Sequence, residues 1–203
     1  ATKDIDFATS LRESPDTALA SLNALVGQDM GDFCAFELTK RQETLDENGY
    51  SRLLKLRYST KVGLEEKDPI LIDLSLDCST TLPPERVSPV NRFEVDGVRT
   101  CDYLLYPLPD QLADKFCAIM ELQPSGWPSS RMKDLVDVVA YATNQEFSLS
   151  QLSLAIQCEC RRREMHIPES FKAPEMWKPR FSAFAKKSKV SKEFATFESA
   201  SAL

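Results

Sequence analysis

This chain of 203 residues contains a single histidine, His166, and its six cysteines form no C-x-x-C pair. These shortages argue against imidazole-based metal chemistry, a Ser–His–Asp triad and a zinc site. No apolar run approaches the roughly 20 residues that a membrane-spanning helix needs, and no signal peptide is visible. We therefore expect a cytoplasmic protein with reduced cysteines and no membrane partner.

Charged residues are plentiful but unevenly distributed. Residues 150–203 hold ten Lys/Arg against six Asp/Glu, although the whole chain has a net charge of −6. A basic segment on an acidic body can supply contacts to nucleic-acid phosphates; a basic helix face exposed to solvent is the alternative. Two clusters are candidates for such contacts, one made up of Arg161, Arg162 and Arg163 and the other of Lys186, Lys187, Lys189 and Lys192.

The opening stretch, ATKDIDFATS, places Asp4 and Asp6 on either side of Ile5. If this stretch is a strand, alternate residues share one face, so the two carboxylates project side by side. Such a pair repels unless a cation lies between its members. Mg²⁺, or Mn²⁺ in its place, commonly binds carboxylates together with substrate phosphates. The alternative is a polar strand edge near a terminus.

A third carboxylate, Asp73, interrupts the apolar run ILIDLSL. A buried strand would not accept an unpaired charge without a large free-energy cost, so we predict that this strand lies beside the first and brings Asp73 to Asp4 and Asp6. Three carboxylates at one metal–phosphate centre are typical of nucleotidyl transfer. The alternatives are a solvent-facing charge on an edge strand and the metal site of a nuclease.

The order of the periodic segments predicts an α+β fold. One helical segment, SPDTALASLNALVGQ, is followed by two strand patterns, GYSRLLKLRYSTKV and DPILIDLSLD. From about residue 109 the spacing of apolar residues becomes helical, and the aromatic residues near the C-terminus are spaced for a further helix. We therefore predict two domains, an α+β domain over residues 1–108 and a helical domain over residues 109–203.

Two helical motifs carry charged side chains near their apolar faces. LPDQLADKFCAIM places Lys115 at the margin of the face that Leu112 and Phe116 form. RMKDLVDVVAYA places Asp134 and Asp137 three residues apart, and therefore on one side of the helix. Taken alone, each motif is compatible with an ordinary helix that bears a salt bridge.

Taken in order, the segments TKDIDFA, IDLSLD, YPLPDQLADKFCAIM and SSRMKDLVDVVAYA resemble the nucleotidyltransferase AbiEii/AbiGii toxin family. The resemblance covers nearly the whole chain and implies a polymerase-β-like nucleotidyltransferase fold with a helical C-terminal domain. It also implies a toxin of a bacterial toxin–antitoxin or phage-defence pair, with a cognate antitoxin. Some members of the family transfer nucleotides from NTP to tRNA acceptor ends, so NTP and RNA are the implied substrates.

The resemblance also implies roles for single residues. Asp4 and Asp6 match the metal-binding aspartates of the D-x-D motif, and Asp73 fits the third strand carboxylate. Lys115 matches a lysine that contacts nucleotide phosphates, a role that its point charge suits, and Asp137 matches the final acidic residue of the catalytic set. The positions implied to bind nucleotide are Thr2, Lys115, Lys133 and Asp134.

A glycine turn precedes the D-x-D strand in this family, where it cradles the triphosphate through backbone N–H groups. All six glycines of this chain lie after residue 26. We expect a segment ahead of Ala1 to carry the turn. The alternatives are a catalytically degenerate protein, which binds nucleotide or RNA without transferring, and a second chain that supplies the turn.

Overall fold

A computed structural model describes residues 4–9, 13–45, 49–76, 78–90, 95–123, 125–188 and 190–202, with Asp4 described by its backbone alone. Thr2 and Lys189 lie outside these ranges. The chain divides into two compact units. The first comprises Ala1–Thr80 and Glu85–Leu105, and the second comprises Thr81–Pro84 and Tyr106–Leu203. A mixed sheet in the N-terminal part and a largely helical C-terminal region confirm the α+β prediction.

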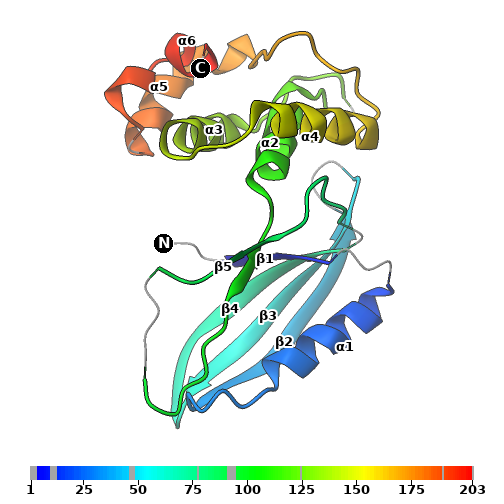
Figure 1. The fold of residues 1–203 in the computed structure, drawn as a ribbon, viewed down its shortest axis with the longest axis vertical. Coiled ribbons are helices and arrows are strands. Elements are labelled where there is room, and N and C mark those ends of the chain that lie inside the picture. The colour runs from blue at the N-terminus through cyan, green and yellow to red at the C-terminus, as the bar shows by residue number, and fades with distance from the viewer. Residues whose placement is uncertain are drawn as a thin grey trace. The chain divides into compact units, whose positions relative to one another are not determined.

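The first unit contains a four-stranded sheet in the order β1-β4-β3-β2 (Figure 1). Its strands are β1 (Asp4–Ala8), β2 (Cys34–Leu45), β3 (Arg52–Val62) and β4 (Glu65–Ser75). β1 runs parallel to β4, whereas β3 pairs antiparallel with both β2 and β4. A separate two-stranded ribbon consists of β5 (Glu85–Val87) and β6 (Tyr103–Leu105).

Helix α1 (Pro15–Val26) covers one face of this sheet (Figure 1). It begins after Ser14, whose side chain accepts a hydrogen bond from the backbone N–H of Thr17, as N-cap residues commonly do. Helix residues Ala18 and Leu19 pack against alternate strand residues, which are Leu54, Leu56, Tyr58, Ile72 and Leu74. Because successive strand residues project to opposite faces, the intervening residues of β3 and β4 lie on the face away from α1.

Strand β2 is not among the strands that the sequence patterns predict. Most of its residues are exposed, and a register shift between Leu38 and Lys40 interrupts its pairing with β3. Its middle part carries charged residues of both signs, Glu37, Lys40, Arg41 and Glu43, where a half-buried strand would alternate apolar with polar residues. Its stability as a strand therefore depends on the hydrogen bonds to β3, which the residue pattern of β2 alone does not reveal.

The second unit is helical. Its elements are α2 (Leu108–Met120), α3 (Met132–Asn144), α4 (Leu149–Arg162), α5 (Lys178–Lys187) and α6 (Phe197–Ser201), with short 3-10 turns η1 (Glu175–Trp177) and η2 (Lys192–Phe194). Asp110 in the first turn of α2 accepts hydrogen bonds from the backbone N–H groups of Thr81 and Leu82 at 2.7 and 3.3 Å. These two bonds explain why residues 81–84 belong to this unit. Within the described part of the chain, no helix is long and apolar enough to cross a membrane.

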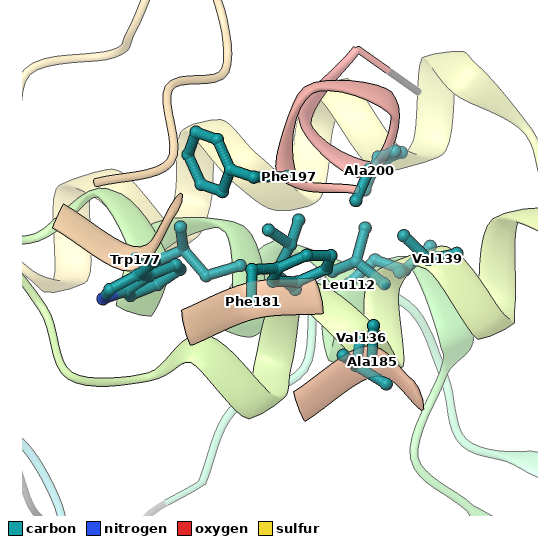
Figure 2. Close-up of a cluster of buried hydrophobic side chains, with 12 residues drawn as sticks. Leu112, Val136, Val139, Trp177, Phe181, Ala185, Phe197 and Ala200 are labelled. Atoms are coloured by element: carbon teal, nitrogen blue, oxygen red, sulfur yellow. The ribbon is translucent and has the colours of Figure 1, made fainter. Parts of the chain in front are cut away.

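Aromatic residues of the C-terminal segment form the centre of the second core (Figure 2). Phe181 is fully buried, and Trp177 donates a hydrogen bond from Nε1 to the carbonyl oxygen of Ser129 at 3.0 Å. The structure confirms a helix in this segment, α5, but forms the rest of the segment into α6 and two 3-10 turns. The reason is that the buried residues Phe181 and Phe197 contact each other from separate helices, which requires the chain to turn between them.

Candidate active site

One candidate cluster lies in the first unit, on the face of the sheet away from α1. Asp6 on β1 and Asp73 on β4 are register partners in the parallel pair. Register partners project to the same face, and neighbouring strands lie about 4.8 Å apart. The structure thus brings two of the three predicted metal ligands together. The third, Asp4, lies two residues before Asp6 on the same strand, and its side chain is outside the described atoms.

A lysine that the sequence motifs did not reveal joins this pair. Lys55 on β3 is the register partner of Asp73, and its Nζ lies 2.7 Å from Asp73 Oδ2. The Asp73 side chain is 23% exposed and that of Lys55 is 49% exposed. Asp6, Asp73 and Lys55 therefore form a row across three neighbouring strands. The signal that could have identified Lys55 is the pairing register of β3 and β4, which is not local in sequence.

The carboxylate oxygens of Asp6 and Asp73 are suitable ligands for a hard divalent cation. Carboxylate oxygens are the protein ligands that Mg²⁺ takes, and the ammonium of Lys55 shows that Asp73 already holds a cation. Among the side chains that the structure describes, no three acidic, histidine or cysteine groups converge as a metal site. A complete site at this position would therefore need Asp4, a nucleotide phosphate or water in addition to Asp6 and Asp73.

A separate candidate cluster lies between α2 and α3 in the helical unit. Lys115 of α2 donates hydrogen bonds from Nζ to Asp137 Oδ2 at 2.8 Å and to Asp134 Oδ1 at 3.2 Å. Both aspartates belong to α3, and their spacing of three residues turns them to the same side, as predicted. Asp134 is buried, whereas the Asp137 side chain is 30% exposed. The structure thus unites Lys115, Asp134 and Asp137.

Arg131 completes this charge cluster, although the sequence analysis did not single it out. It donates from Nε to Asp134 Oδ2 at 2.6 Å, so that the buried carboxylate of Asp134 binds one cation with each oxygen. Arg131 directly precedes the first residue of α3. The backbone N–H of Arg131 donates a hydrogen bond to Ser129 Oγ. Lys133, by contrast, is exposed on the surface of α3.

The electrostatic surroundings keep Lys115 charged. Burial by itself lowers its pKa, but the hydrogen bond to Asp137 and the negative charges of Asp134 and Asp137 together outweigh burial. The pKa of Lys115 therefore lies above its ordinary value. An ammonium group has three donors, of which the two aspartates take two, and no hydrogen bond to another of the described residues takes the third.

The three consecutive arginines at the end of α4 lie in different environments. Arg161 is exposed, whereas Arg163 is buried and ion-paired with Asp114, Glu121 and Glu159 at 2.5, 2.7 and 2.5 Å. Burial by itself lowers the pKa of Arg163, but the negative charge of Asp114 and the contacts with Glu159 raise it. Arg163 is thus a charged residue of the interior that joins α2 to α4.

The other predicted RNA-binding residues are more accessible. Arg162 donates from Nη2 to Glu159 Oε1 at 2.5 Å and lies 3.8 Å from Asp114. Lys186 and Lys187 are exposed in the last turn of α5. The α4 and α5 ends of the helical unit therefore present Arg161, Lys186 and Lys187 to solvent, and RNA contact by these residues stays a prediction.

Carboxylates on neighbouring strands of a mixed sheet, followed by a helical region with a lysine–aspartate cluster, are typical of enzymes that transfer nucleotides. The chain belongs to the family described as nucleotidyl transferase AbiEii toxin, type IV toxin–antitoxin system, whose family model matches residues 1–200. The resemblance expected from the sequence motifs is therefore confirmed. A comparison with curated proteins found no significant match.

Proposed function

We propose that this chain is an NTP-dependent nucleotidyltransferase toxin that adds nucleotides to RNA, with tRNA as the acceptor and Mg²⁺ or Mn²⁺ as the cofactor. The observation that carries the proposal is the register pair Asp6–Asp73, because it places two carboxylates side by side on the face of the sheet away from α1. Membership in the nucleotidyltransferase family supports the use of NTP, and the mixed sheet supports a polymerase-β-like fold.

Asp6 and Asp73, together with Asp4, are the residues that would hold the divalent cation. Divalent cations held there would supply activation of the attacking hydroxyl by one ion and neutralisation of the leaving pyrophosphate by another. Lys115 is proposed to donate its remaining N–H to a phosphate oxygen of the nucleotide. Asp137 and buried Asp134 hold the Lys115 ammonium in place, and Arg131 neutralises the second oxygen of Asp134. Lys133 and Thr2 are further proposed contacts to the nucleotide.

A transfer assay tests the proposal directly. The full chain is incubated with total tRNA, Mg²⁺ and each α-³²P-labelled NTP in turn, and RNA is then separated on a denaturing gel. We expect labelled RNA with at least one nucleotide and none when the divalent cation is chelated. Binding of NTP or RNA without labelling would instead identify a catalytically degenerate binding protein, and shortened RNA without labelling would identify a nuclease.

Replacing Lys115 with Met is expected to lower kcat/KM for NTP by about a hundredfold, the size of effect seen when one charge-stabilising donor is lost. The substitution removes the ammonium but keeps an unbranched side chain of similar length. Lys172→Met is the matched control, because Lys172 is an exposed lysine of the same unit outside the charge cluster. Equal kcat/KM values for K115M and K172M would contradict the role of Lys115.

Reversing the charges of Lys186 and Lys187 to Glu is expected to weaken tRNA affinity several-fold and to reduce its dependence on salt. NTP binding should stay unchanged, because the exposed end of α5 is separate in sequence and in contacts from the Lys115 cluster. Fluorescence anisotropy with labelled tRNA between 50 and 200 mM salt measures both quantities. The double reversal Lys61→Glu/Lys67→Glu is the control for net charge. Identical salt slopes in the two variants would exclude Lys186 and Lys187 from the RNA site.

A further inference from the structure

The face of the sheet away from α1 carries acidic side chains on two neighbouring strands and basic side chains on the next strand. Asp6 on β1 lies opposite Asp73 on β4, which in turn lies opposite Lys55 on β3. One pairing step farther along the same face, Arg57 of β3 lies opposite Leu71 of β4. The carboxylates thus occupy the β1 and β4 half of the face, and the cationic side chains lie on the neighbouring strand.

The two partners of the Lys55–Asp73 ion pair differ in how far their side chains are exposed to solvent. The carboxylate of Asp73 is more than three-quarters buried, whereas half of the Lys55 side chain remains open to solvent. A partly buried carboxylate next to another carboxylate needs a positive charge close by. Lys55 Nζ at 2.7 Å from Asp73 Oδ2 supplies that charge. Its open half leaves the ammonium room to move away without disturbing the core beneath the sheet.

We propose that the Lys55 ammonium competes with the divalent cation for the carboxylate of Asp73. This inference rests on the proposed function, in which Asp6 and Asp73 hold the metal. The ammonium neutralises Asp73 while the metal is absent and is displaced from Asp73 when the cation binds. The ion pair thereby keeps the carboxylate row ordered in the metal-free protein, and it sets the metal affinity lower than the carboxylates alone would give.

Metal titration of the full chain tests this inference without nucleotide or RNA. Mn²⁺ binding is followed by electron paramagnetic resonance for the wild type, Lys55→Met and Lys55→Arg. We expect K55M to bind Mn²⁺ roughly five- to tenfold more tightly, since it removes a positive charge a few ångströms from the ion. K55R keeps the charge and should bind Mn²⁺ as the wild type does.

Lys67→Met is the matched control. Lys67 lies on β4, is exposed to the same extent as Lys55 (49%) and is also ion-paired, with Glu65 at 2.5 Å. Removing its charge should leave Mn²⁺ affinity unchanged, because it lies six residues from Asp73 along an extended strand. Circular dichroism and thermal melts verify that the variants are folded, and Lys55→Gln provides a second uncharged variant.

Lysine acetylation gives an independent readout. Adding Mg²⁺ should raise the acetylation rate of Lys55 relative to Lys67 in the wild type, as measured by mass spectrometry. Equal Mn²⁺ affinities of K55M, K55Q and the wild type, or an unchanged acetylation rate of Lys55, would overturn the inference.

Labelling of RNA by the wild type in the same Mg²⁺ buffer separates this inference from the proposed function. If RNA is labelled while K55M binds Mn²⁺ no more tightly, the inference about Lys55 alone is wrong. If the wild type neither binds Mn²⁺ nor labels RNA, the proposed function is wrong as well.

Discussion

Asp6→Asn is expected to reduce nucleotide transfer to RNA by about a thousandfold, because loss of a metal-ligating charge removes several kcal/mol of transition-state stabilisation. The amide has nearly the same size as the carboxylate but carries no charge. Asp6 is exposed, so the substitution should leave the sheet intact. Asp73→Asn and Asp4→Asn should have effects of similar size if the three residues share one cation.

The loss of transfer has to be separated from a loss of folding. Asp68→Asn is the matched control, since it makes the same change at an exposed position of β4 remote from Asp73. Asp73→Asn also removes the partner of Lys55, but a half-exposed ion pair contributes only about 0–1 kcal/mol to stability. RNA labelling by folded D6N at the wild-type rate would exclude Asp6 from the metal site.

Arg163→Met is expected to lower the free energy of unfolding by about 3–5 kcal/mol, the usual consequence of removing one partner from a buried ion pair. The side chain of Arg163 is only 3% exposed, and Asp114, Glu121 and Glu159 surround its guanidinium. Without it, three carboxylates would lie close together, with Arg162 contacting Asp114 and Glu159 as the nearest basic side chain described. Met preserves the bulk of the side chain, so that the effect is mainly electrostatic.

Urea unfolding followed by circular dichroism measures this effect. Arg161→Met is the control, because Arg161 lies two residues before Arg163 and is exposed. This substitution should change the free energy of unfolding by no more than about 0.5 kcal/mol, as surface substitutions usually do. Equal unfolding midpoints for R163M and R161M would show that the buried arginine does not stabilise the helical unit. The comparison also bears on RNA binding, because reversing all three arginines together would disturb folding. Arg161 reversed alone is therefore the informative variant at this site.

Much of the fold follows from local patterns. The alternation of Leu54, Leu56 and Tyr58 predicts β3, and the helical spacing of Leu112, Phe116 and Ile119 predicts α2. These patterns identify elements correctly because each element buries one face against the core. The spacing of Asp134 and Asp137 likewise predicts that both lie on one side of α3, and the structure shows both in contact with Lys115.

The remaining features depend on contacts between residues distant in sequence. Lys55 joins Asp73 only through the register of β3 and β4, and a shift by one residue would turn it to the opposite face. The arginine run at the end of α4 has the composition of an exposed cationic surface. Arg163 is buried nonetheless, because Asp114 of α2 and Glu121, which directly follows α2, form ion pairs with it.

The charged strand β2 has a consequence for the behaviour of this protein at high concentration. It is the terminal strand of the described sheet, and twelve residues of extended backbone would offer a template on which another chain could add a strand. Exposed Glu37, Lys40, Arg41 and Glu43 oppose such pairing, because an incoming strand would have to match both signs of charge. The register shift after Leu38 also bends the edge locally. Both features therefore disfavour the addition of a strand from another chain along β2.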